Sequence, residues 1–357
     1  MVKHSAYSNL KVFHHRSCID AMAHKIHIAP VHVQLIPTNR CNQACVGCAY
    51  RTKGYSSSQM FHAGDEIPWS KLVEVVEDCR AMGVRAIQLT GGGEPTVHPE
   101  FLQLCEMILG EEIDLGLVTN GVLWTPEHTE VLQHAKWVRF SIDAGCAETY
   151  ASYRHARPEA YDKVREAVRQ LTRSRKSNIS DRPLVGVGFV VNDRNWLEVV
   201  EATKRARDDG ADNLRISALF QPQGAAYFRN FYAEAKEACR EAASLATETF
   251  TVFNMFCDRL QDLFAASPDY SFCGTSRMMT YLGADCTVYT CCMNAYNERG
   301  ILGSFKDQRL VDLWTSSLLI EKLFSLDATQ CPPCMYNGKN SAIAYAMDPL
   351  PPHVNFV

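Results

Sequence analysis

The chain has 357 residues, of which 36 are Lys or Arg and 40 are Asp or Glu, so its formal net charge is −4, and 46 % of its residues are hydrophobic. These values describe a globular protein of enzyme size, and the 15 cysteines, about 4 % of the chain, are too sparse for a disulfide scaffold and odd in number. We expect neither a secretory signal nor a membrane span, because no charged start leads into an apolar run and no apolar run reaches about 18 residues. The sequence therefore predicts a cytoplasmic protein whose clustered cysteines bind metal or take part in catalysis.

Short apolar runs rich in β-branched residues alternate along the chain with segments of helical periodicity. The predicted strands are 31–36, 86–90, 114–119, 137–142, 185–191 and 213–217. The predicted helices are approximately 68–82, 99–110, 125–135, 158–174 and 194–209. Six strands that alternate with helices predict an α/β fold with a parallel sheet, either doubly wound or a partial barrel. In both arrangements ligands bind at the carboxyl ends of the strands.

The sequence on either side of this alternation has a different character. Residues 1–29 are polar, rich in histidine and weakly periodic, which predicts an extended or short-helical lead-in. The Ala- and Glu-rich stretch 228–265 predicts a long helix or a helix pair, residues 279–291 alternate as a β-hairpin does, and the rest is loop-dominated. The predicted organisation is a lead-in over 1–29, a barrel over 30–222 and a smaller C-terminal unit over 223–357.

Nine of the fifteen cysteines lie in two groups, and the first group directly follows the first predicted strand. It comprises Cys41, Cys45 and Cys48 in the run CNQACVGC. Three thiolates at these spacings can bind three irons of a cubane cluster and leave the fourth iron open, as catalysis requires. A zinc site completed by a distant histidine is the alternative. The six scattered cysteines are expected to act as small hydrophobes: Cys18, Cys79, Cys105, Cys146, Cys239 and Cys257.

The cysteine motif has a companion after the second predicted strand. It is the run Gly91, Gly92, Gly93, Glu94 and Pro95. Together the two motifs closely resemble the radical S-adenosylmethionine (SAM) superfamily, over roughly residues 31–220. The resemblance implies a partial (β/α)6 TIM-like barrel, a [4Fe–4S] cluster on the three cysteines, and SAM chelating the open iron. The glycines suit this role, because residues without a Cβ let the backbone approach the methionine moiety closely.

Other strand ends carry weaker matches to the SAM-binding positions of that family. Asn120 lies at the end of the third strand, and Ser141 and Asp143 at the end of the fourth are candidates for the ribose hydroxyls, with helix capping as the alternative for Asp143. Arg215 and Ser217 at the end of the sixth strand are candidates for the SAM carboxylate, since a guanidinium pairs well with a carboxylate.

Two further positions concern the adenine of SAM. Val187 on the fifth strand could pack against it, or could belong to the core. The family usually has an aromatic residue just before the third cysteine, where this chain has Gly47. Tyr50, two residues beyond Cys48, is the candidate substitute.

The second cysteine group resembles the twitch domain, a shortened relative of the SPASM extension that holds one auxiliary [4Fe–4S] cluster. The ligands that the resemblance implies are Cys273, Cys291, Cys331 and Cys334. It also implies a small β-hairpin plus helix unit, with four-cysteine zinc as the alternative. The family expects glycine where this chain has Cys286, so Cys286 or Cys292 could replace Cys291 as a ligand, or could donate a hydrogen atom to the substrate. We favour four ligands, a closed site suited to electron transfer or structure.

The resemblance implies an oxidoreductase or isomerase in which SAM yields a 5′-deoxyadenosyl radical that removes a hydrogen atom from the substrate. We expect a small polar substrate such as a carbohydrate or nucleoside, and dehydrogenation, epimerisation or isomerisation, because only about forty residues precede the first cluster. The alternatives are a ribosomal-peptide-modifying radical SAM enzyme and a non-catalytic iron–sulfur or zinc protein. The expected electron donor is a reductase, flavodoxin or ferredoxin. The charge of −4 argues against nucleic acid, no membrane partner is expected, and the oligomeric state is left open.

Overall fold

One sheet organises the molecule in this computed structural model, which describes residues 6–174 and 183–349. Within these residues its ten strands follow the order β10-β9-β8-β1-β2-β3-β4-β5-β6-β7. The strands are β1 His32–Leu35, β2 Ala86–Leu89, β3 Asp114–Thr119, β4 Trp137–Ser141, β5 Leu184–Val191, β6 Asn213–Ala218, β7 Thr251–Met255, β8 Met279–Leu282, β9 Thr287–Tyr289 and β10 Ile301–Ser304. The six predicted strands are β1 to β6, all paired in parallel, so the predicted α/β fold with a parallel sheet is confirmed.

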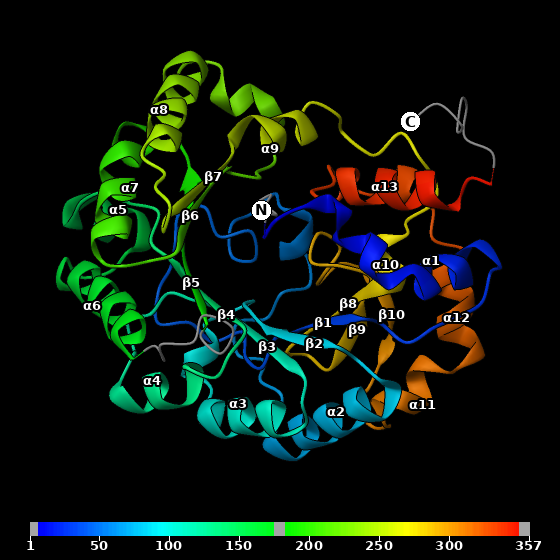
Figure 1. The fold of residues 1–357 in the computed structure, drawn as a ribbon. Helices are drawn as coiled ribbons and strands as arrows, with labels where there is room; N and C mark the ends of the chain where they lie inside the picture. The colour runs from blue at the N-terminus through cyan, green and yellow to red at the C-terminus, as the bar shows by residue number, and fades with distance from the viewer. Residues whose placement is uncertain (1–5, 175–182, 350–357) are drawn as a thin grey trace.

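The helices follow the curved sheet on its outer side, as Figure 1 shows for α2 to α8. The α-helices are α1 Arg16–Ala23, α2 Trp69–Met82, α3 Phe101–Gly110, α4 Pro126–Leu132, α5 Ala147–Arg154, α6 Glu159–Arg173, α7 Val199–Asp208, α8 Tyr232–Ser244, α9 Phe256–Asp262, α10 Thr275–Met278, α11 Leu310–Trp314, α12 Ser317–Phe324 and α13 Asn337–Met347. The 3₁₀ helices are η1 Asn9–His15, η2 Ser56–Ser58, η3 Pro95–Val97, η5 Trp196–Glu198, η6 Gly224–Phe228, η7 Glu298–Gly300 and η8 Ala328–Gln330. In the part of the chain that the structure describes, no helix combines the length and apolar character needed to cross a bilayer.

Local sequence explains where several outer helices begin and end. Pro126 starts α4 with a φ already suited to a helix, and Thr125 and His128 form a capping box there. Gly83 ends α2 in the left-handed conformation at φ +78°. Helix α2 therefore ends at the predicted residue 82, and α4 begins one residue after its predicted start at 125.

The main hydrophobic core lies between the sheet and the outer helices. Four alternate residues of β5 are buried in it: Val185, Val187, Phe189 and Val191. Because successive side chains of a strand point to opposite faces, Gly186 and Gly188 face the concave side of the sheet. The same alternation turns Arg139 of β4 and Arg215 of β6 to the concave side, since Val138, Phe140, Leu214 and Ile216 are in the core. The concave side therefore carries polar residues, among them the candidate residues Arg215 and Ser217.

The C-terminal third extends the same sheet. The predicted hairpin is confirmed as β8 and β9, and β8 also pairs in parallel with β1, with His32 opposite Met279. The prediction of helix alone over 228–265 is wrong, because β7 lies between α8 and α9 and pairs in parallel with β6. The expectation of a loop-dominated end is also wrong, since α11, α12 and α13 occupy it. In both places the element forms because it packs against a part of the chain that is distant in sequence. Such packing leaves no pattern in the local sequence.

The N-terminal segment lies on the open side of the curved sheet, near α13 (Figure 1). Its short helices η1 and α1 agree with the predicted lead-in. Val12, Ile19 and Met22 pack with Met278 and Ile343 in a separate hydrophobic cluster. Tyr7 stacks edge to face on Phe253 of β7, with ring centroids 4.9 Å apart. The segment thus bridges the gap between β7 and α13.

Candidate active site

The three cysteines of the first motif lie in the loop after β1, and none of them forms a disulfide. This loop is fastened on both sides by backbone hydrogen bonds. Gly93 N donates to Thr38 O at 3.1 Å and Glu94 N donates to Arg40 O at 2.9 Å, while Val46 N donates to Tyr153 O at 2.9 Å. The loop is therefore held between the segment after β2 and helix α5.

The three glycines after β2 are required by close backbone approach. A Cβ at Gly91 would collide with Gly93 O, one at Gly92 with Asn39 Oδ1, and one at Gly93 with Arg40 O. The contacts at Gly92 and Gly93 pack the segment directly on the cysteine loop, whereas the contact at Gly91 lies within the segment itself. A glycine run here therefore has a steric cause, beyond its value as a motif.

The buried carboxylate of Glu94 joins the ends of β2 and β3. Its Oε1 accepts from Thr119 Oγ1 at 2.5 Å and Thr96 Oγ1 at 2.9 Å, and its Oε2 accepts from Asn120 N at 2.7 Å. Burial raises the pKa of Glu94, and these donors oppose that rise. Asn120 in turn donates from Nδ2 to Asn42 Oδ1 in the cysteine loop at 2.7 Å. The predicted residues Glu94 and Asn120 are thus brought to the cysteine loop.

Arg154, at the end of α5, contacts the cysteine loop directly and was missed by sequence reasoning. Its Nη1 donates to Cys45 Sγ at 3.3 Å, and its Nη2 donates to Asp143 Oδ2 at 2.6 Å and to Ser141 O at 2.7 Å. The second carboxylate oxygen of Asp143 accepts from Val190 N at 2.7 Å. Each oxygen of Asp143 therefore accepts one hydrogen bond from the protein, and Asp143 positions Arg154, while the ribose contact stays a prediction. The alternative of a helix cap is not seen, because Cys146 is the N-cap of α5.

The expected aromatic before the third cysteine has a structural replacement. A Cβ at Gly47 would collide with Tyr153 Oη, so the ring of Tyr153 from α5 fills the space that the glycine leaves. Tyr50 instead points toward β8, where Tyr281 Oη donates to Tyr50 Oη at 3.1 Å. Tyr153 could not be found from the motif, because its helix lies far from the motif in sequence.

The remaining predicted SAM residues are distributed between the two faces of the sheet. Val187 belongs to the main core, beside the outer helices, which favours the core alternative over the adenine contact. Arg215 and Ser217 lie on the concave side of β6. The Arg215 guanidinium lies over the Tyr7 ring, 5.1 Å from its centroid, and its Nε has no hydrogen-bond partner among the described residues. Ser141 is half-buried at the end of β4.

The four predicted auxiliary cysteines line one small pocket between β9 and α13. They are Cys273, Cys291, Cys331 and Cys334. Asn294 Nδ2 donates to Cys331 Sγ at 3.2 Å, and Tyr336 N donates to Cys334 Sγ at 3.3 Å. Burial raises the pKa of the Cys334 thiol to about 11, and the neighbouring Cys273 and Cys331 add to that rise. Thiolates in this pocket would need a cationic metal core, and amide donors to sulfur suit such thiolates, so the pocket fits an iron–sulfur cluster.

The thiols of Cys41, Cys45 and Cys48 also fit an iron–sulfur cluster. Burial raises the pKa of the Cys41 thiol to about 11, so thiolates there also need a cationic partner. No three His, Cys, Asp or Glu side chains of the described residues converge on one point as the ligands of a single ion do. The thiolates of a cubane bind separate irons and need no such convergence.

Cys286 and Cys292 lie outside this set of four. Cys286 adopts φ +60° in the turn between β8 and β9, and it is buried in the main core. Cys292 Sγ lies 3.1 Å from Tyr336 Oη, in a cluster that includes Tyr50 and Tyr281. Neither residue lines the pocket of the four cysteines. The structure therefore brings Cys291 to that pocket and places the two other thiols elsewhere.

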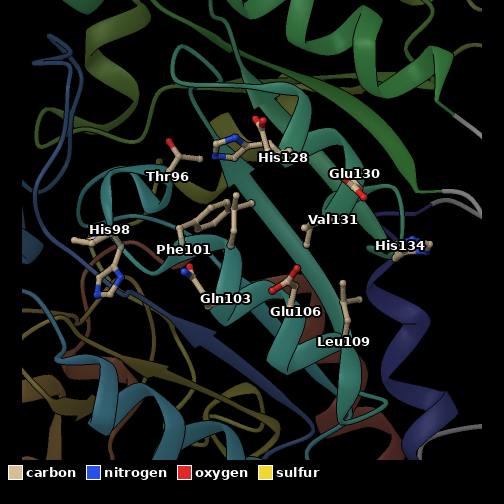
Figure 2. A pocket seen from close by; sticks show the side chains of 13 residues that line it. Thr96, His98, Phe101, Gln103, Glu106, Leu109, His128, Glu130, Val131 and His134 are labelled. Atoms are coloured by element: carbon tan, nitrogen blue, oxygen red, sulfur yellow. The ribbon is translucent and has the colours of Figure 1, made fainter.

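A broad groove lies on the outside of the molecule, between α3 and α4 (Figure 2). Its lining includes Phe101, Glu130 and three histidines, and most of its lining residues belong to α3 and α4, on the helix-covered side of the sheet. His98 Nε2 pairs with Ile67 O at 3.0 Å, and His128 Nδ1 pairs with Thr125 Oγ1 at 2.8 Å. These rings already serve the fold, so the groove is not assigned to the active site.

Two family models match the chain. Residues 35–202 match the radical SAM superfamily, and residues 273–336 match an iron–sulfur cluster-binding domain, SPASM. The first contains the cysteine loop and the glycine run, and the second contains the four-cysteine pocket. The matches therefore coincide with the two sites described above.

The names of proteins similar to this chain indicate that they act on several kinds of molecule. The tungsten-containing aldehyde ferredoxin oxidoreductase cofactor-modifying protein of Pyrococcus furiosus is 26 % identical over 186 residues, 51 % of this chain and 49 % of that protein. The mycofactocin maturase MftC of Mycobacterium tuberculosis is 28 % identical over 198 residues, 55 % and 46 % of the two chains. The probable GTP 3′,8-cyclase of Thermococcus kodakarensis is 26 % identical over 221 residues, 59 % and 65 %. The chain spans about half the length of the first two relatives.

Solved structures share the fold at low sequence identity. SuiB of Streptococcus suis bound to S-adenosylmethionine is 13 % identical, with a TM-score of 0.61 over 91 % of this chain and 75 % of that chain. The structure of anSMEcpe with bound AdoMet and a Kp18Cys peptide is 14 % identical, with a TM-score of 0.59 over 89 % and 97 %. The likeness extends over both the barrel strands and the C-terminal region.

Proposed function

This chain belongs to the radical SAM superfamily and carries a SPASM-type iron–sulfur domain, and from this premise we propose that it removes a hydrogen atom from a small polar substrate. Its cofactors are SAM, a [4Fe–4S] cluster and an auxiliary iron–sulfur cluster. Cys41, Cys45 and Cys48 would hold the [4Fe–4S] cluster, which would supply the electron for reductive cleavage of SAM to methionine and a 5′-deoxyadenosyl radical, the group that would take the hydrogen atom. The observation that carries the proposal is the loop of Cys41, Cys45 and Cys48, packed directly on the glycine run at the strand ends.

The residues of this chain hold the reacting groups in place. Arg154 sets a positive charge beside Cys45, and Asp143 fixes the orientation of its guanidinium. Glu94 and Asn120 tie the cysteine loop to β3. Ser141, Arg215 and Ser217 remain our candidates for SAM, on the concave side. A displacement of about 1 Å at such a site can cost on the order of a hundredfold in rate, which is why these supports matter.

A small substrate is favoured by the way in which the N-terminal segment occupies the open side of the sheet. Tyr7 packs against Phe253 of β7 and lies under the guanidinium of Arg215. This contact narrows the space beside β6 and β7. A compact polar molecule fits such a space more readily than an extended chain.

The fate of the substrate radical depends on a hydrogen donor or an electron acceptor nearby. We assign Cys292 as the candidate donor, because its thiol contacts the Tyr336 hydroxyl. The hydrophobic cluster of side chains to which Cys292 belongs also includes Tyr50, two residues beyond Cys48. Hydrogen return from this thiol would give epimerisation. Electron transfer to the auxiliary cluster would give dehydrogenation, with a reductase, flavodoxin or ferredoxin as the external partner.

A maturation reaction on a peptide or cofactor precursor is the second candidate. It is favoured by relatives named as a mycofactocin maturase and as a cofactor-modifying protein. Incubation of the enzyme with small polar substrates and with peptides, followed by mass spectrometry of the products, separates the two.

The test is anaerobic reconstitution with iron and sulfide, then incubation with SAM and dithionite. The wild type should bind about eight irons and release 5′-deoxyadenosine. Replacing Cys41, Cys45 and Cys48 together by Ala should abolish that release. Cys257→Ala is the matched control, because Cys257 is exposed on α9, and it should behave as the wild type. Release of 5′-deoxyadenosine by the triple variant would refute the proposal.

A further inference from the structure

Four cationic side chains gather on the concave side of the sheet without an acidic partner among the described residues. They are Lys11 of η1, Arg139 of β4, Arg215 of β6 and Lys339 of α13. We call them the cationic chamber. Lys11 lies exposed at its edge, and the other three are half-buried.

The sheet itself brings the two arginines together. Arg139 lies opposite Gly186, and Arg215 opposite Gly188, so both flank β5 where it has no side chains on the concave face. A Cβ at Gly188 would lie 3.7 Å from Arg139 Cδ, an ordinary contact distance. The Arg139 side chain therefore lies over Gly188, directly beside the strand position opposite Arg215, while Asn213 Oδ1 covers Gly186.

The other side of the chamber is formed by α13. Lys339 Nζ lies 5.5 Å from the centroid of the Tyr336 ring, whose hydroxyl contacts Cys292. This places the chamber beside the thiol that we assign as hydrogen donor. A molecule held by the chamber would therefore reach the space between the two cluster sites.

The cations of the chamber repel one another. Burial, together with the neighbouring charges of Arg139 and Arg259, lowers the pKa of Arg215 to about 9. Burial also lowers the pKa of Lys339, with Lys11 and Arg259 contributing. The Nε atoms of Arg215 and Arg259 are buried without a hydrogen-bond partner among the described residues.

Two carboxylates close to the chamber form their ion pairs with other side chains. Asp143 is held by Arg154 at 2.6 Å, and Asp262 is held by Arg259 at 3.1 Å and by Asn337 at 3.0 Å. Buried cations without counter-ions are costly, so an anion that enters the chamber is stabilised by all of them. The carboxylate of SAM, for which Arg215 is the candidate, would use only one of the four cations.

We propose that the cationic chamber binds an anionic group of the substrate, a carboxylate or a phosphate, so that the enzyme selects an acidic small molecule. This inference rests on the proposed function, since it names the substrate class of the same site. Arg139 and Lys339 are the specificity residues, because they carry the charge that SAM does not need. Guanidinium and ammonium groups recognise both oxyanions through charge-assisted hydrogen bonds.

The test uses the reconstituted holoenzyme with inorganic phosphate and with succinate as probes, and with sodium chloride at equal ionic strength as the reference. Isothermal titration should show saturable binding of at least one oxyanion to the wild type. Lys339→Met and, separately, Arg139→Met should weaken that binding about tenfold or more. Lys236→Met is the matched control, because Lys236 lies over the Tyr232 ring at 5.9 Å on exposed α8, and it should bind as the wild type does.

Two further measurements distinguish loss of anion binding from loss of folding and from loss of activity. The melting temperature of each variant without anion shows whether it folds, and loss of an unpaired cation should leave it unchanged or raised. Binding of neither probe, or equal binding by Lys339→Met and the wild type, overturns the inference. Release of 5′-deoxyadenosine is measured in the same preparation, and its absence in the wild type would overturn the proposed function separately.

Discussion

Arg154 and Cys45 are joined by a hydrogen bond in which guanidinium Nη1 donates to the sulfur at 3.3 Å. The other terminal nitrogen of Arg154 donates to Asp143 at 2.6 Å, and both side chains are buried. A cation beside a cluster thiolate offsets part of its negative charge, which favours addition of an electron to the cluster. Arg154 thus links the charge of the cluster site to the end of β4.

Arg154→Met should lower both stability and cluster potential. Removal of one partner of a buried ion pair costs about 3–5 kcal/mol of unfolding free energy, because Asp143 stays buried without its counter-ion. Urea unfolding measures the first effect, and a redox titration followed by electron paramagnetic resonance measures the second. Arg240→Met is the control, since Arg240 pairs with Glu237 on the exposed surface of α8 and should change neither. An unchanged potential would contradict the assigned role of Arg154.

Gly47→Ala should destabilise the cysteine loop by about 1–3 kcal/mol, because the added methyl group collides with Tyr153 Oη. Tyr153→Ala in the same chain should relieve this collision, so the two changes should couple in a double-mutant cycle. Gly110→Ala is the control, since a Cβ there meets nothing within 4 Å. Additive effects at Gly47 and Tyr153 would show that the two residues do not share this space.

The auxiliary ligand set can be counted by iron content. Single replacement of Cys273, Cys291, Cys331 or Cys334 by Ala should lower the bound iron from about eight toward about four per chain. Cys286→Ala and Cys292→Ala should keep the full iron content, because neither thiol lines the four-cysteine pocket. If Cys292→Ala loses iron and Cys291→Ala keeps it, Cys292 rather than Cys291 is the cluster ligand.

His32 should make stability depend on pH in the acid range. Burial lowers the pKa of His32 to about 4 from 6.5, and Lys339 and Lys11 add to the shift. Between these values the unfolded chain binds a proton that the folded chain does not, so stability falls as pH falls, by up to about 3 kcal/mol. His32→Gln should flatten this part of the profile in urea unfolding at several pH values. His62→Gln is the control, since the His62 side chain is 78 % exposed, and a profile unchanged by His32→Gln would refute the assignment.

The sequence by itself determined the elements whose pattern is local. The six parallel strands alternate between residues buried under the outer helices and residues on the concave side, and their helices show the periodicity of one buried face. Cys41, Cys45 and Cys48 lie within one loop, so their spacing, together with the glycine run, predicts that the sulfurs share a cluster. The glycine run follows from the close packing of that loop on its neighbour.

Tertiary structure decided the rest, because contacts between distant residues leave no periodicity in the chain. The placement of Tyr153 beside Gly47, of Arg154 beside Cys45 and of β7 beside β6 depends on how α5 and α8 pack. The cationic chamber joins residues from η1, β4, β6 and α13, which no window of sequence contains. Local sequence thus specifies the cofactors through short motifs, whereas the substrate site is assembled from elements that meet only in the folded chain.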